Sequence, residues 1–179
     1  PNNRYRNVLN RIGATPFLLA AKAADVEMMR LLVELGADPL IPNEDGTTPL
    51  MVAAGVGIWA VGESPGTNKE ALAAVKYALE LGGDATTVDD NGDTALHGAT
   101  IRSSEPLVRF LLAEGADIDA INEKGWTPLR IARGVFYSNT GKRWPEMEVL
   151  LHSLGADERL VTGADNTISD WTVEGVEPR

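Results

Sequence analysis

The sequence is poor in the residues that support redox chemistry, metal binding and membrane insertion. It has no cysteine, so disulfide bonds and thiolate metal sites are excluded. Its two histidines, His97 and His152, do not fit the spacing of a zinc site or of a Ser/His/Asp group. No stretch approaches the roughly 20 consecutive apolar residues that a membrane-spanning helix needs. We therefore expect no metal site, no cofactor, no catalytic residues and no membrane span.

Positive charge is also scarce. The chain has 16 Lys and Arg residues against 26 Asp and Glu residues, and its net charge is −10. The first twelve positions carry Arg4, Arg6 and Arg11 and no acid, and residues 125–157 are slightly positive. Proteins bind nucleic-acid backbones mainly through Lys and Arg, so the charge argues against a nucleic-acid partner and suits a basic protein partner. The hydrophobic share of 44% indicates a folded chain.

What the sequence does contain is an internal repeat, the strongest indication of architecture that a single chain can give. Each copy opens with a glycine followed by Thr-Pro-Leu or a close variant, and it closes near Gly-Ala-Asp. The openings begin at Gly13, Gly46, Gly92 and Gly125, and the closings at Gly36, Gly82, Gly115 and Gly155. Because such units bury their apolar faces only by stacking, the repeat predicts an array.

The first copy indicates how one unit folds. Thr15 is expected to cap a first helix, with Pro16 at the first helical position, where its missing N–H has no cost. Asp25 is expected to cap a second, amphipathic helix, which ends at Gly36. The dipeptide Asp45-Gly46 is typical of a tight turn. Each unit is therefore predicted to be two helices followed by a projecting hairpin.

The phrase Gly-x-Thr-Pro-Leu-His-x-Ala, the ending Leu-Leu-x-x-Gly-Ala-Asp and a period of 33 residues together resemble ankyrin repeats. The resemblance covers residues 13–157. It implies an all-α repeat fold, an ankyrin-type α-solenoid of helix-turn-helix units with short β-hairpin fingers. The family's histidine after Thr-Pro-Leu is present only as His97, since the other copies have Leu18, Met51 and Arg130.

The resemblance also predicts how the chain is organised. The four repeats are expected at residues 13–45, 46–91, 92–124 and 125–157. The second and fourth are enlarged between their helices by insertions at residues 57–69 and 134–145. Residues 158–179 are expected to form a C-terminal cap and tail. Residues 1–12 are expected to be the end of a preceding repeat, with a basic N-terminal arm as the alternative.

In ankyrin repeats the finger tips and first helices line a concave surface that binds proteins. The expected function is thus protein–protein interaction by a monomeric, non-enzymatic array. The residues expected to contact the partner are Glu44, Asp45, Thr47, Asp90, Asn91, Asp93, Arg102, Glu123, Lys124 and Trp126. Packing of Trp126 against the neighbouring finger is an equal alternative to binding.

The insertions are expected to form a second binding surface. Its candidate residues are Trp59, Tyr137, Lys142, Arg143 and Trp144. For Trp59 and Trp144, packing against their own repeats is the alternative.

Two other functions are compatible with the sequence. In one, the array is a regulatory or substrate-presenting module of a larger enzyme whose catalytic domain precedes it. In the other, it is a structural spacer. The compartment stays open, because a chain without cysteine suits oxidising and reducing environments alike and any targeting signal would precede residue 1.

Overall fold

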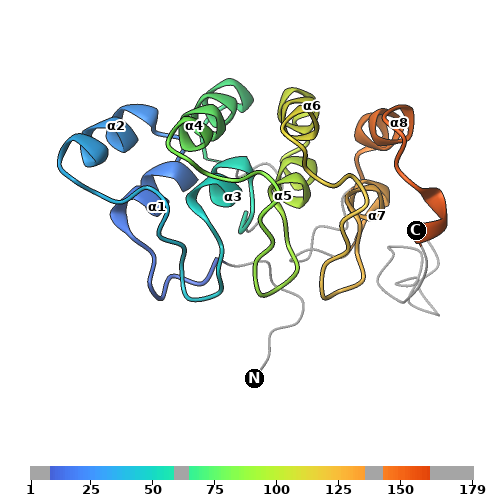
Figure 1. The fold of residues 1–179 in the computed structure, drawn as a ribbon. Coiled ribbons are helices and arrows are strands. Elements are labelled where there is room, and N and C mark those ends of the chain that lie inside the picture. The colour runs from blue at the N-terminus through green and yellow to red at the C-terminus, as the bar shows by residue number, and fades with distance from the viewer. Residues whose placement is uncertain (1–8, 59–64, 136–142, 162–179) are drawn as a thin grey trace, which may run out of the picture.

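The computed structural model describes residues 9–58, 65–135 and 143–161, which fold into a row of helix pairs. The pairs are α1 (Pro16–Lys22) with α2 (Val26–Glu34), α3 (Pro49–Ala54) with α4 (Asn68–Glu80), α5 (Ala95–Ile101) with α6 (Glu105–Ala113), and α7 (Pro128–Arg133) with α8 (Pro145–Ser153). A short 3-10 helix, η1 (Glu158–Leu160), follows α8. Figure 1 shows the first helices of the pairs in one layer, the second helices in another, and the fingers projecting away from both. The expected all-α solenoid is confirmed.

The helices begin and end where the sequence predicts. The hydroxyl of Thr15 accepts the Leu18 N–H at 3.1 Å, and Asp25 accepts the Met28 N–H at 2.9 Å. Thr48, Thr94 and Thr127 cap the other first helices in the same way. Gly36 follows α2 with a φ of +89°, a left-handed conformation that favours glycine. Side-chain caps at the start and glycine at the end therefore set the helix lengths.

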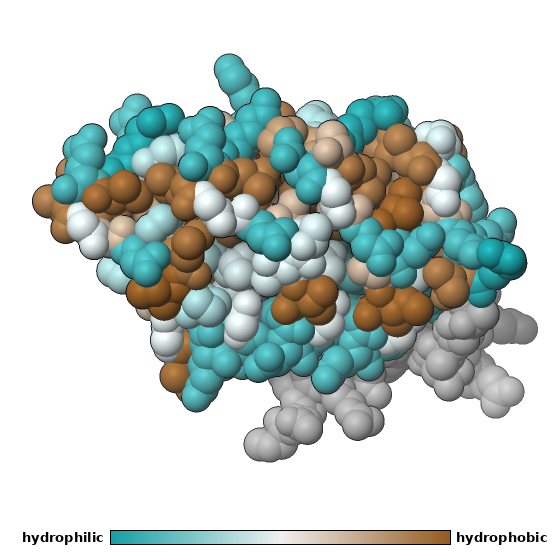
Figure 2. All heavy atoms as spheres, viewed as in Figure 1, coloured by the Kyte–Doolittle hydropathy of each residue, from teal (hydrophilic) through white to brown (hydrophobic). Residues whose placement is uncertain are grey.

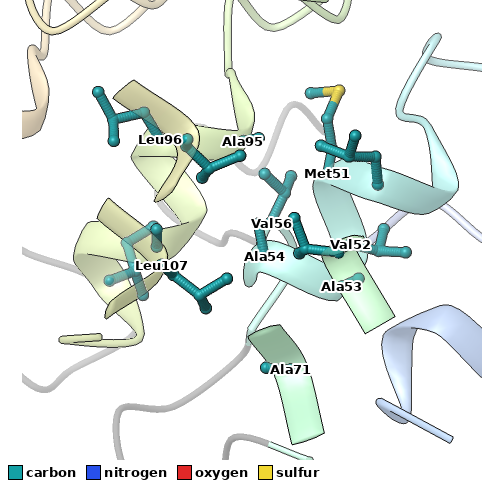
Figure 3. Close-up of a cluster of buried hydrophobic side chains, with 14 of the residues drawn as sticks. Met51, Val52, Ala53, Ala54, Val56, Ala71, Ala95, Leu96 and Leu107 are labelled. Atoms are coloured by element: carbon teal, nitrogen blue, oxygen red, sulfur yellow. The ribbon is translucent and has the colours of Figure 1, made fainter. Parts of the chain in front are cut away.

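The core lies at the joints between neighbouring pairs. Figure 3 shows one such cluster, in which Met51 and Val52 of α3, Leu96 of α5 and Leu107 of α6 come together. Two glycines let α3 and α5 approach closely. A Cβ on Gly55 would lie 2.5 Å from the Gly98 carbonyl oxygen, so no larger residue fits without a shift.

The fingers are tight turns with almost no strand structure. In the described residues the β-structure is limited to one isolated bridge between Val88 and Thr94. The expected short β-hairpins are therefore reduced to their turns. The reason is local: in the first finger the Thr47 N–H donates to the Asn43 side chain at 2.8 Å, so this N–H is not free to extend a ladder.

Two helices begin inside the predicted insertions. α4 begins at Asn68 and α8 at Pro145, inside the predicted insertions 57–69 and 134–145. The Lys22 ammonium donates to the Gly57 carbonyl at 2.7 Å and ties the start of the first insertion to α1. The middle of both insertions, residues 59–64 and 136–142, lies outside the described residues.

The two ends of the row differ in chemistry. At the first end, Leu19 and Met28 are each 44% exposed, whereas the equivalent Val52 and Leu107 in later pairs are buried. At the last end, Arg133 donates to Glu148 at 2.8 Å and to Glu158 at 2.6 Å, which gives an ionic surface. The interpretation of residues 1–12 as the end of a preceding repeat stays a prediction, and residues 1–8 and 162–179 lie outside the described chain.

Candidate protein-binding surface

Each finger is built around one amide or carboxylate side chain at its base, namely Asn43, Asp89 or Asn122. In each case the Oδ1 atom accepts the backbone N–H groups two and four residues later, at distances between 2.8 and 3.1 Å. The donors are Asp45 and Thr47, Asn91 and Asp93, and Lys124 and Trp126. Short polar side chains form such bonds readily, and here they fold the finger tip into a compact turn.

Neighbouring fingers are joined by one repeated backbone bond. The Asp90 N–H donates to the Asp45 carbonyl at 2.9 Å, and the Glu123 N–H donates to the Asn91 carbonyl at the same distance. The Glu44 N–H makes the equivalent bond to the Ile12 carbonyl at 2.9 Å. The tips are therefore held side by side in a fixed register.

Buried side chains add a second set of links at the finger bases. The Thr47 hydroxyl donates to Asp89 Oδ2 at 2.9 Å, and Asn122 Nδ2 donates to Asp93 Oδ1 at 2.8 Å. Burial raises the pKa of Asp89, and the nearby Asp93 carboxylate raises it further, while the hydrogen bond from Thr47 opposes the shift. These acids are part of the interior of the array.

His97 connects the base of the third finger to α5. Its Nδ1 atom accepts the Thr94 N–H at 3.1 Å, so the proton is on Nε2, which donates to the Trp126 carbonyl at 3.0 Å. Burial lowers the pKa of His97, although the Asp93 carboxylate pulls in the opposite direction. A neutral histidine in this position is a structural link and has no access to a substrate.

The finger tips carry the exposed charge. Glu44, Asp90 and Glu123 occupy the same position of three successive fingers, and all three are exposed. Within the described part of the chain, none of these carboxylates forms an ion pair. Figure 2 shows the corresponding edge of the molecule as a hydrophilic band. The tips thus form a row of unpaired negative charge on a rigid support.

The residues predicted to contact a partner divide into two groups. Glu44, Asp90, Asn91 and Glu123 are exposed, and Asp45 and Lys124 are half-buried. The buried group is Thr47, Asp93, Arg102 and Trp126, whose exposed fractions are 2%, 3%, 7% and 5%. The expectation that these four residues line the surface is therefore not met.

Trp126 illustrates why the second group is buried. Its backbone N–H donates to Asn122 Oδ1 at 3.0 Å, its backbone carbonyl accepts from His97 Nε2, and its ring lies 5.2 Å from the Lys124 ammonium. The backbone bond to His97 joins the third finger to α5, and the ring is 5% exposed. Trp126 is therefore packed within the array, as the alternative to binding expects.

Arg102 is buried because it binds the backbone of the first insertion. Its guanidinium donates to the carbonyls of Pro65, Gly66 and Thr67, at 2.6, 2.9 and 3.2 Å, and thereby holds the end of the first insertion against α5. Burial lowers the pKa of Arg102. The donors of this side chain are therefore used by the loop and do not face a partner.

The predicted second surface is described only in part. Arg143 is exposed, whereas Trp144 is 7% exposed and its N–H donates to the Ala132 carbonyl at 2.9 Å. Trp144 therefore packs against its own repeat. Trp59, Tyr137 and Lys142 lie outside the described residues, so their part of the prediction stays open.

Two other types of site are absent from the described residues. Across residues 9–58, 65–135 and 143–161, no group of three or more His, Cys, Asp or Glu side chains is arranged to hold a metal ion. In the same residues, no helix combines the length and the apolar character needed to cross a bilayer.

The sequence analysis does not predict the side chains that anchor the finger bases. A signal for them exists, because Asn10, Asn43, Asp89 and Asn122 each stand three residues before a turn glycine. The same spacing recurs four times, and in each case the side chain accepts an N–H two residues later.

The chain matches family models of ankyrin repeats and several known proteins. The family model "Ankyrin repeats (3 copies)" matches residues 66–134 and the model "Ankyrin repeat" matches residues 12–44, together more than half of the 179 residues. The chain is 28% identical over 180 residues to the nuclear factor NF-kappa-B p105 subunit of Gallus gallus, covering 96% of this chain and 17% of that protein.

Two further relatives match shorter parts. Over 155 residues the chain is 30% identical to ankyrin repeat and SOCS box protein 16 of Homo sapiens, covering 70% of this chain and 34% of the relative. Over 61 residues it is 38% identical to the RelA-associated inhibitor of Mus musculus, covering 34% of this chain and 7% of the relative. The chain thus spans about a third or less of the length of these relatives.

Proposed function

Because this chain belongs to the ankyrin repeat family, whose repeats generally mediate protein–protein interaction, we propose that it binds a protein partner along its acidic finger tips. The observation that carries the proposal is the row formed by Glu44, Asp90 and Glu123. The three carboxylates are exposed, stand at the same position of successive fingers, and have no ion-pair partner among the described residues.

The charge of this row indicates the chemistry of the partner. A surface with lysine or arginine side chains at matching spacing would be attracted to it, and this row of carboxylates would steer the encounter at low ionic strength. Charges at the rim of an interface act mainly on the rate of association and on specificity. We therefore expect binding that weakens as salt is added.

The buried finger bases support this function without touching the partner. The backbone bonds between fingers and the Asn43, Asp89 and Asn122 anchors fix the tips before binding. A preorganised surface loses less conformational entropy on association, so more of the contact energy becomes affinity.

The test compares two triple variants that change the charge equally. The tip variant carries Glu44→Lys, Asp90→Lys and Glu123→Lys. The matched control carries Glu34→Lys, Glu80→Lys and Glu114→Lys, which are exposed acids at the ends of α2, α4 and α6. Each immobilised variant is used to capture proteins from a cell extract, and the captured proteins are quantified by mass spectrometry.

The expected result is a protein that wild type and control capture and the tip variant does not. If the control loses the same proteins as the tip variant, net charge alone explains the capture. If the tip variant retains every protein, the finger tips are not the binding surface. Circular dichroism of both variants checks that the fold is intact.

A further inference from the structure

A cleft of about 190 Å³ opens at the junction of the first and second repeats. It lies beside α3 and α4, whose places in the row Figure 1 shows. Its walls come from the connection that follows α2, from the start of α3, and from the end of α4 with the loop behind it. No finger-tip residue lines it. The cleft is therefore separate from the surface proposed above.

A small residue on α4 opens the cleft. Ala78 stands where the other three repeats have leucine, and those residues are Leu32, Leu111 and Leu151. Alanine has three carbon atoms fewer than leucine. Gly83 stands where the other repeats have alanine but adds no space, because a Cβ there would lie 2.8 Å from the Ala78 carbonyl oxygen and 3.2 Å from Leu50 Cδ1.

The space is open to solvent and has apolar walls. Leu50 is buried at its floor, and Pro39 and Leu40 form a wall contributed by the first repeat. Leu40 is 47% exposed, and Gly82 and Asp84 at the opposite edge are also exposed. An aliphatic side chain from another molecule could enter without any rearrangement of the helices.

The edge of the cleft is acidic. Asp84 lines it, and hydrogen bonds from the Thr86 hydroxyl and N–H hold the pKa of Asp84 below its usual value, so the group stays ionised. Asp38 accepts the N–H of the wall residue Leu40 at 2.9 Å. Among the residues that the structure describes, no Lys, Arg or His lines the cleft. Any segment seated there is favoured if positive charge flanks its apolar residue.

We propose that this cleft binds a leucine-sized aliphatic side chain of a partner peptide in which lysine or arginine flanks that residue. The size follows from the leucine that the other three repeats have in place of Ala78, and the flanking charge follows from Asp38 and Asp84. Burying an aliphatic side chain in an apolar pocket is favourable in proportion to the area removed from water. The site is independent of the finger tips, so either proposal can fail without the other.

The chain supplies a variant that closes the cleft. Ala78→Leu restores the residue present in the other three repeats, and a filled cavity commonly leaves stability unchanged or raises it. Loss of binding in this variant would therefore not reflect unfolding. Leu40→Ala is the second variant, because it removes an exposed wall and places no extra atoms in the core.

The probe is the blocked tripeptide acetyl-Lys-Leu-Lys-amide, with acetyl-Lys-Ala-Lys-amide as its matched control. Binding is followed by NMR through the methyl signals of Ala78 and Leu50 during titration. The expected result is saturable shifts with a dissociation constant of about 1 mM for the leucine peptide, and binding at least about tenfold weaker for the alanine peptide. Ala78→Leu should abolish the shifts of Leu50, and Leu40→Ala should weaken them.

Three outcomes would overturn the proposal. The Leu50 signals could remain unshifted at saturating peptide, the two peptides could bind equally, or Ala78→Leu could bind as well as wild type. The cleft would then be a packing gap that affects stability alone. Asp84→Asn tests the charge, since unchanged affinity for the leucine peptide would remove the flanking cation from the proposal.

Discussion

The base and the tip of each finger contain the same kinds of residue and have opposite roles. Asp89, Asp93 and Asn122 at the bases are buried and bonded to neighbouring fingers. Glu44 and Asp90 at the tips are exposed and unpaired within the described residues. The comparison shows that acidic residues three positions apart can belong either to the core or to the surface. The net charge of the chain is therefore a poor measure of the charge that a partner meets.

The largest expected difference between base and tip comes from reversing the charge of an acid in each. Asp93→Lys would place an ammonium against Asn122 Nδ2, itself a donor, in a buried site. We expect it to lower the free energy of unfolding by about 3 kcal/mol or more, whereas Asp90→Lys should change it by less than about 0.5 kcal/mol. Urea unfolding followed by circular dichroism measures both. Equal effects would mean that base and tip do not differ.

A milder change tests the amide at the base of the third finger. Asn122→Asp replaces the donor to Asp93 by a second carboxylate, so we expect a loss of about 1–3 kcal/mol in the free energy of unfolding. The same substitution at the exposed tip, Asn91→Asp, should have almost no effect. Thermal unfolding of the pair decides the matter, and a stable Asn122→Asp variant would contradict the role assigned to the amide.

The smallest effect concerns Asp89 and depends on pH. Because its pKa in the folded chain is raised above the unfolded value near 3.8, its stabilising contribution is fully present below that value. The contribution is lost as pH rises through the folded pKa. Asp89→Asn, which introduces the residue found at the other finger bases, has no such loss. We expect the variant to gain stability relative to wild type between about pH 4 and pH 7, by about 1 kcal/mol or less.

Asp84 provides the control of opposite sign. Hydrogen bonds from Thr86 lower its pKa, so its contribution is present above the unfolded pKa and is lost as pH falls through the folded one. Asp84→Asn should therefore be less stable than wild type at pH 7 and equal to it in acid. Unfolding midpoints measured across the pH range for both variants would contradict the account if the two trends had the same sign.

The fold was predictable because each element depends on local residues. Thr15 and Pro16 start a helix and Gly36 ends one, through bonds and backbone angles within a few positions. The repeat then predicted stacking without any knowledge of the contacts. The fingers were less predictable, because side-chain anchors such as Asn43 use N–H groups that a hairpin ladder would need.

For the candidate surface, the sequence predicted exposed residues correctly only at the tips. Residues beside the turn glycine, such as Glu44 and Asp90, are exposed by the geometry of the turn itself. Asp93, Trp126 and Arg102 are buried by partners about thirty or more positions away, and no local pattern reveals such contacts. The contrast between Ala78 and its three leucine equivalents is visible in the sequence, but the cleft it leaves depends on how Leu40 and Leu50 are placed.

The most direct test of the division between base and tip is a pair of measurements on the single variant Asp90→Lys. Its unfolding midpoint in urea and its dissociation constant for the captured partner are compared with those of wild type. The account predicts an unchanged midpoint and an affinity lower by about tenfold, with a weaker dependence on salt. An unchanged affinity, or a midpoint lowered as far as in Asp93→Lys, would contradict it.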